Sequence, residues 1–90
     1  MGQVAVTLKV MPSSPDVDLA VLKERIENLF EEYHEVKLQQ ITEKPIGFGL
    51  IALNVLIVMP DGAGGTDRIE EAMRGIDGVA SVESEDVTLI

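Results

Sequence analysis

Residues 50–59 read Leu-Ile-Ala-Leu-Asn-Val-Leu-Ile-Val-Met, a stretch that is apolar at every position except Asn54. A strand with apolar side chains on both faces is typical of the middle of a sheet whose two sides are at least partly covered. This segment is therefore expected to form a central strand, and the other elements are placed around it.

The residues before this strand predict a further strand and a helix. Residues 4–10 alternate between apolar and polar side chains, which is typical of a half-buried strand. Residues 11–16 predict a loop, because their two prolines disfavour both helix and strand. Either Asp16 or Asp18 is expected to cap a helix that ends at His34 and Glu35. Its apolar residues recur on one side of the helix: Leu19, Leu22, Ile26, Leu29, Phe30 and Tyr33.

The remaining segments predict the other half of the fold. Residues 35–42 alternate loosely, with a slip of parity at Ile41 that indicates a bulge or a strand end, and residues 43–49 predict a turn. After a glycine-rich loop at residues 61–65, Thr66 is expected to cap a second helix that Gly75 or Gly78 ends. The last strand is expected at residues 79–90, with a break near residues 84–86. The apolar residues of the expected second helix are Ile69, Ala72, Met73 and Ile76.

This order predicts one domain, residues 1–90, of the α+β class. The expected fold is a ferredoxin-like βαββαβ two-layer sandwich, with a four-stranded antiparallel sheet and two helices on one face. The first and third strands are then central. Four apolar residues of the third strand would then lie on the sheet face away from the helices. Either that face meets another surface, or the parity of the third strand is reversed. The apolar residues in question are Leu50, Ala52, Leu56 and Val58.

Charge and composition narrow the functional classes. Seven basic and sixteen acidic side chains give a formal net charge of −9, which disfavours direct binding to nucleic acid or to anionic membranes. No stretch approaches the ~20 apolar residues that cross a bilayer, and the first residues lack a signal-peptide pattern, so a cytoplasmic location is expected. Without cysteine, neither a disulfide nor a thiolate metal site is predicted.

Side chains that could catalyse a reaction are scarce. The single histidine, His34, follows the end of a helix and is interpreted as a surface residue. Acidic pairs such as Glu31 and Glu32 are interpreted as solvated, and no metal or cofactor is expected. The loop at residues 61–66 is interpreted as a connection rather than a phosphate site, because no lysine follows its glycines and acidic residues surround it.

Phe48 is the candidate functional residue that the pattern singles out. Of three aromatic rings, two lie on the apolar stripe of the first helix, whereas Phe48 stands between Gly47 and Gly49. Exposed aromatic rings on loops commonly bind protein partners, because they bury a large area at little cost in rotamer entropy. The alternative is that Phe48 folds back and covers the end of the sheet.

Several motifs resemble the nucleotide-exchange domain of the elongation factor 1-beta family over essentially the whole chain. The most specific are Lys44-Pro45-Ile46-Gly47-Phe48-Gly49-Leu50, Gly65-Thr66-Asp67 with Glu70-Glu71, and residues 79–82. A weaker similarity lies in Val10 with Pro12, and in Asp18 with Leu22. The length is like that of the stand-alone archaeal members.

The resemblance implies a non-enzymatic factor that exchanges GDP for GTP on the elongation factor 1-alpha GTPase by stabilising its nucleotide-free state. It implies that Phe48 inserts into the GTPase. A lysine that the family carries just before its terminus is replaced by Leu89 and Ile90, so more of the contact is expected at Phe48 and the sheet surface. The expected partner-binding residues are Lys44, Pro45, Ile46, Gly47, Phe48, Gly49, Leu89 and Ile90.

Two other functions of the same topology are considered. An ACT-like regulatory domain would bind an amino acid near the first strand–helix loop, and the prolines and serines of that loop do not exclude a ligand. An acylphosphatase needs an arginine in this loop to hold phosphate, and residues 11–16 contain none. The ACT-like domain is the alternative that stays open.

Overall fold

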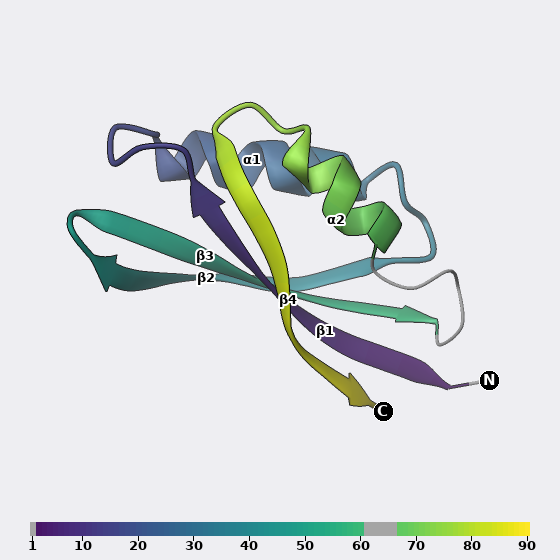
Figure 1. Ribbon diagram of the computed structural model, residues 1–90. Coiled ribbons are helices and arrows are strands. Elements are labelled where there is room, and N and C mark those ends of the chain that lie inside the picture. Colours follow the sequence, from purple (N-terminus) through teal and green to yellow (C-terminus); the bar gives the residue numbers. More distant parts are fainter. Residues whose placement is uncertain (1, 61–66) are drawn as a thin grey trace.

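The computed structural model describes residues 2–60 and 67–90. Along the chain, the elements are β1 (Gln3–Pro12), α1 (Leu19–Phe30), β2 (Lys37–Gly47), β3 (Leu50–Pro60), α2 (Asp67–Arg74) and β4 (Val79–Leu89). The strands form one antiparallel sheet in the order β2-β3-β1-β4, and both helices cover the same face (Figure 1). This arrangement confirms the ferredoxin-like α+β fold with β1 and β3 at the centre. The predicted loop at residues 61–65 and the cap at Thr66 lie outside the described residues.

The core lies between the sheet and the helices, where alternate strand residues meet the apolar side of each helix. Period two in the strands and period three to four in the helices bring these side chains to one layer. Each fully buried aliphatic side chain contributes about 1.5–3 kcal/mol through its removal from water. The buried set is Val6, Leu8, Val10, Leu22, Ile26, Phe30, Val36, Leu53, Val55, Ile57, Met59, Ile69, Met73 and Val82.

Helix α1 is capped by Asp18 and is shorter than predicted. The Asp18 carboxylate accepts hydrogen bonds from the backbone N–H groups of Ala20 and Val21, at 3.0 and 3.4 Å, so Asp18 and not Asp16 is the cap. The predicted end at His34 and Glu35 is wrong, because the helix ends at Phe30. A series of turns follows and brings Val36 into the core, where it contacts the buried cluster.

Strand β2 is longer than predicted, and the turn after it is shorter. The predicted turn at residues 43–49 is wrong, because β2 continues to Gly47 and only Phe48 and Gly49 lie between the strands. Pro45 is compatible with this strand, because β2 lies at the edge of the sheet, where a missing N–H donor is tolerated. A register shift between Leu38 and Gln40 confirms a bulge as the reason for the slip of parity.

The predicted boundaries of β1 and β4 need similar corrections. Strand β1 continues into the predicted loop, since Met11 pairs with Ser81 and Pro12 pairs with Val79. The predicted break in the last strand is a bulge within a continuous β4, where the register with β1 shifts by one residue between Ser84 and Asp86. Both errors interrupt a strand that continues, because proline and polar residues disfavour a regular strand in the sequence pattern.

The parity of β3 follows from its register with β1. Leu56 pairs with Thr7 and Val58 with Ala5, and both pairs alternate with residues that face the helices. The side of the sheet away from the helices is called the open face below. The four residues Leu50, Ala52, Leu56 and Val58 lie on it, so the reversed parity is excluded. In the described part of the chain, no helix has the length and apolarity needed to span a membrane.

Candidate protein-binding site at the β2–β3 turn

Phe48 and Gly49 form the two-residue turn between β2 and β3. Gly47 and Leu50 are the last paired residues, and the backbone φ angles are 56° at Phe48 and 76° at Gly49. Two-residue hairpins with positive φ at both central positions are type I′ turns, for which Asn-Gly is a preferred sequence. Gly47, with φ of 103°, also takes a conformation that favours glycine. The glycines on both sides therefore make the tight turn possible.

The Phe48 side chain is 100% exposed. The other two rings belong to the helix side, where Phe30 is 5% exposed and Tyr33 is half-buried with the Arg68 guanidinium 5.7 Å from its centroid. The interpretation of Phe48 as a cover over the end of the sheet is therefore excluded. Its ring is free to enter a surface pocket of another protein.

The position of Phe48 is unfavourable for the isolated protein. A residue with a Cβ in the left-handed region costs about 1–2 kcal/mol relative to the right-handed one. In addition, the exposed ring contributes no burial to the core. Backbone strain at a residue that adds no stabilising contact to the folded protein is typical of functional sites. Binding of the ring by a partner would supply that function.

The structure brings six of the predicted site residues together at this end of the sheet. Lys44 pairs with Ala52 on the open face, and Pro45 pairs with Ile51 on the opposite side. Ile46 lies in the register shift before the turn and is half-buried. Apart from Ile46, the members of this group are exposed. The group consists of Lys44, Pro45, Ile46, Gly47, Phe48 and Gly49.

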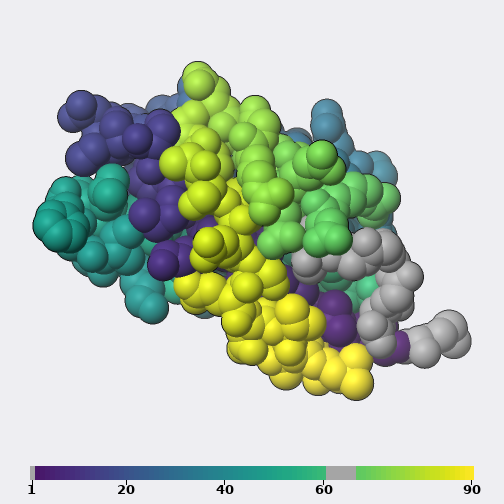
Figure 2. Space-filling model, in the orientation of Figure 1, coloured from purple at the N-terminus to yellow at the C-terminus, as the bar shows by residue number. Residues whose placement is uncertain are grey.

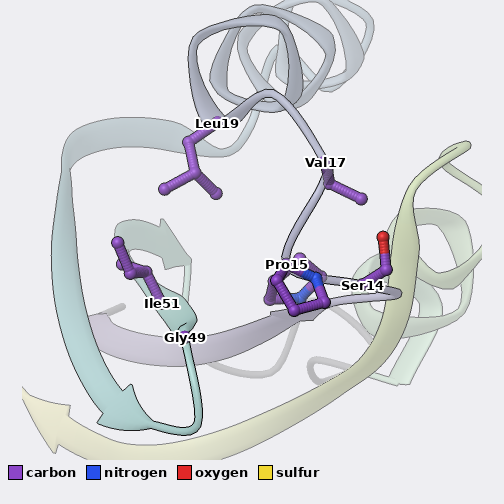
Figure 3. A pocket seen from close by; sticks show the side chains of 7 residues that line it. Ser14, Pro15, Val17, Leu19, Gly49 and Ile51 are labelled. Atoms are coloured by element: carbon purple, nitrogen blue, oxygen red, sulfur yellow. The ribbon is translucent and has the colours of Figure 1, made fainter.

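The loop between β1 and α1 supports the turn from one side, a contact that the sequence did not predict. Pro15 comes within 3.9 Å of the position that a Cβ would take at Gly49. A cavity of about 60 Å³ lies beside the turn, with Val17, Leu19 and Ile51 around it (Figure 3). Small-molecule sites usually have volumes of about 300–1,000 Å³, so this cavity is too small for such a ligand, whereas an open hollow of about 410 Å³ borders the same loop at Ser13, Val17 and Asp18.

Leu89 and Ile90 lie at the opposite end of the sheet from Phe48. Leu89 pairs with Val4 at the start of β1, and the Ile90 N–H donates to the Gln3 carbonyl at 2.8 Å. Val4 also pairs with Met59 of β3, and ten residue steps along β3 separate Met59 from Gly49 in the turn, which corresponds to about 33 Å. Figures 1 and 2 show the turn and the end of β4 at opposite ends of the molecule. The predicted site is therefore divided into two places.

The residues at this second end form a small apolar surface. Leu89 is 67% and Ile90 is 69% exposed, and Val87 beside them is also exposed. The prediction missed Val87, although its alternation with Leu89 in the sequence would have placed both side chains on one face of the strand. Three exposed aliphatic residues at one strand end suit contact with a protein.

The described residues offer little that could carry out a reaction. Within residues 2–60 and 67–90, no group of three or more His, Cys, Asp or Glu side chains is placed to hold a metal ion. His34 is exposed, as predicted. Several carboxylates face cations, as in the pairs Lys23–Glu43 and Arg68–Glu35, both at 2.6 Å. The arrangement suits recognition of a partner by an exposed ring and apolar ends.

A solved structure and a family model match this chain. The fold is similar to the solution structure of the C-terminal domain of the MgtC protein from Mycobacterium tuberculosis, with a TM-score of 0.64, 15% identity, and coverage of 93% of this chain and 86% of that one. At that identity, the likeness concerns the fold alone. The family model described as the EF-1 guanine nucleotide exchange domain matches residues 5–90.

Full-length relatives agree with the family model. Elongation factor 1-beta of Methanothermobacter thermautotrophicus is 52% identical over 87 residues, which cover 97% of this chain and 96% of the relative. The protein of the same name from Methanosphaera stadtmanae is 53% identical, with the same coverage, and that from Natronomonas pharaonis is 47% identical over 97% of both chains. The chain therefore belongs to the elongation factor 1-beta family of guanine nucleotide exchange domains.

Proposed function

We propose that this exchange domain acts on the elongation factor 1-alpha GTPase by inserting Phe48 into it and stabilising its nucleotide-free state. As a member of its family, the protein is a nucleotide exchange factor of translation elongation and not a catalytic enzyme. The observation that supports the role of Phe48 is its complete exposure in a turn whose backbone disfavours a side chain there. The proposal joins the function of the family to this one residue.

Exchange by this route needs no covalent step, because it relies only on the coupling between two binding free energies of the GTPase, one for GDP and one for the exchange factor. A factor that weakens GDP binding to the GTPase by a given ratio is itself bound more weakly, by the same ratio, when GDP is present. The contacts of Phe48 must therefore be better with the nucleotide-free GTPase than with its GDP form. We place the ring in a site whose packing is incompatible with ordered coordination of magnesium and diphosphate.

The turn suits this task because it holds the ring in place before binding. A phenylalanine side chain buries about 150–250 Å² when it enters a pocket. A short hairpin turn, supported by Pro15, limits the chain entropy that would be lost on binding. Removing such a central aromatic side chain costs about 2 kcal/mol or more of binding. That loss corresponds to about a thirtyfold weaker complex.

The residues around Phe48 and those at the far end complete the proposed contact surface. Lys44, Pro45, Ile46, Gly47 and Gly49 are expected to lie against the GTPase around the inserted ring. Leu89 and Ile90 form a separate apolar contact at the other end of the sheet. Because the two places are about 33 Å apart, each would touch a different part of the partner.

The proposed partner is a protein and neither nucleic acid nor a membrane. A formal net charge of −9 repels phosphate backbones and anionic lipid headgroups. The exposed groups proposed for binding are an aromatic ring and aliphatic side chains, which recognise apolar pockets.

The test follows release of labelled GDP from elongation factor 1-alpha of the same organism. The wild-type domain is expected to accelerate release, and Phe48→Ala is expected to reduce the acceleration by about thirtyfold at subsaturating concentration. The matched control is Val21→Ala, which removes a 39% exposed aliphatic side chain on α1 and should leave release unchanged. Equal release by the wild type and a folded Phe48→Ala variant would exclude Phe48 from the mechanism.

A further inference from the structure

The open face of the sheet is the neutral side of a strongly acidic molecule. Its basic residues are Lys37 and Lys44 on β2 and Lys9 on β1, as the strand register shows. Its acidic residues are Glu83 and Asp86 on β4, together with Glu85 in the bulge, whose carboxylate lies 4.0 Å from the Lys9 ammonium. Three positive and three negative charges cancel, so the formal net charge of −9 resides in the rest of the chain.

These charges are separated across the face. The β2 edge carries Lys37 and Lys44, the β4 edge carries the three acidic residues, and the strip between them is mainly apolar. That strip is formed by the half-buried side chains of Ala5, Met11, Leu50, Leu56 and Val58. A surface with one basic edge, an apolar centre and one acidic edge is complementary to a copy of itself turned around an axis parallel to the strands.

We propose that the open face binds a second copy of this chain in such a symmetric dimer, which shares only Lys44 with the proposed contact with the GTPase. A twofold axis parallel to the strands places β2 of one copy over β4 of the other, and β3 over β1. Sheets packed face to face keep their strands within about 30° of each other, so residues at the same level along the strands stay close. A twofold axis perpendicular to the strands would instead place like charges over each other.

The register gives the pairs that this dimer would form. The row Thr42, Asn54, Lys9 and Glu83 crosses the four strands at one level. Under the proposed symmetry, Asn54 of one copy faces Lys9 of the second copy, and Thr42 faces Glu83. The next row places Gln40 over Asp86 and Leu56 over Thr7. Donors thus meet acceptors at both edges, and the apolar strip meets side chains of β1.

The size of the face predicts a weak dimer. Four strands about 4.8 Å apart, each with about eight residues of 3.3 Å, give about 500 Å² of sheet per copy. The total buried area of about 1,000 Å² lies at the lower limit for specific interfaces. A dissociation constant in the micromolar to millimolar range is therefore expected. The two Phe48 turns would lie at the same end of the dimer and project away from it.

Sedimentation equilibrium of the full chain, from micromolar to millimolar concentration, tests the proposal. The wild type is expected to dimerise reversibly, and Leu56→Glu to raise the dissociation constant by about thirtyfold or more, because it buries an unpaired charge in the apolar strip. The control Val21→Glu adds the same charge at an exposed position on α1 and should dimerise like the wild type. A wild type that stays monomeric over the whole range would overturn the proposal.

Exchanging the charges of Lys44 and Glu83 tests whether the β2 edge of one copy lies over the β4 edge of the second copy. Lys44 and Glu83 lie on opposite edges of one sheet, about 14 Å apart, but in neighbouring rows across the proposed interface. Lys44→Glu and Glu83→Lys should each weaken the dimer, and the double variant should restore it. Both residues are exposed, so the variants are expected to fold. Absence of restoration would contradict the dimer. A Leu56→Glu variant that reduces GDP release while the wild type is monomeric would also contradict it and would assign this face to the GTPase.

Discussion

At the scale of single residues, Phe48 combines an unfavourable backbone conformation with complete exposure. The turn would be more stable with asparagine, because Asn-Gly is a preferred pair for a type I′ turn. The ring is thus expected to lower the stability of the free protein and to raise its affinity for the partner. Natural proteins keep such local conflicts mainly at functional sites.

This conflict predicts opposite effects of Phe48→Asn on stability and on exchange. Relief of the left-handed strain should raise the free energy of unfolding by about 1 kcal/mol. For a domain of this size, that gain corresponds to a melting temperature about 4–8 °C higher. Exchange activity should fall as it does for Phe48→Ala. Thermal unfolding followed by circular dichroism measures the first effect.

The contrasting variant at the same turn is Gly49→Ala. Gly49 has a φ of 76°, where alanine is strained, so this variant should unfold at a lower temperature than the wild type. If both substitutions changed the melting temperature in the same direction, the strain attributed to Phe48 would be wrong. The flanking glycines predicted that Phe48 is special, but its φ and its full exposure could be known only from the structure.

At the scale of the elements, the cap of α1 is held by one carboxylate. Asp18 accepts both hydrogen bonds from the first turn of the helix, although Asp16 is equally acidic and lies two residues earlier. Asp18→Ala should lower the free energy of unfolding by about 1 kcal/mol. Asp16→Ala should change it by no more than about 0.5 kcal/mol. Urea unfolding of the two variants compares them directly, and equal losses would contradict the assignment of the cap.

The number, type and order of the elements could be predicted from the periodicity of apolar residues. The ends of α1 and β2 could not. Tyr33 continues the apolar spacing of the helix, but the chain leaves the helix after Phe30 so that Val36 can enter the core. Pro45 suggests a turn by its chemistry, yet an edge strand accepts it, because one side of that strand has no neighbour. In both places, tertiary contacts outweighed a local preference.

At the scale of the whole molecule, the two proposed contact places lie at opposite ends of the sheet. The sequence indicated both places, but it could not show that they are separate, because the distance depends on the register of β1 with β3 and β4. The shape of the molecule, with extents of 41 × 23 × 18 Å, reflects this long arrangement. A partner that contacts both ends must extend along the strands.

This separation predicts that changes at the two ends act independently. Phe48→Ala and a variant with serine at positions 89 and 90 should each weaken binding to the nucleotide-free GTPase. Sites more than about 7–10 Å apart usually show additive effects within about 0.3–0.5 kcal/mol. Isothermal titration calorimetry of the two variants and their combination measures the coupling. A larger coupling energy would show that the ends do not bind as separate places.

The most direct test of the central claim observes the Phe48 ring itself. The chain has two phenylalanines, so labelling with fluorophenylalanine gives one signal from the exposed Phe48 and one from the buried Phe30. On addition of nucleotide-free elongation factor 1-alpha, the Phe48 fluorine signal should shift and lose its contact with solvent, whereas the Phe30 signal should keep its chemical shift. A complex in which the Phe48 signal stays at its free position, still accessible to solvent, would contradict the insertion of this ring into the GTPase.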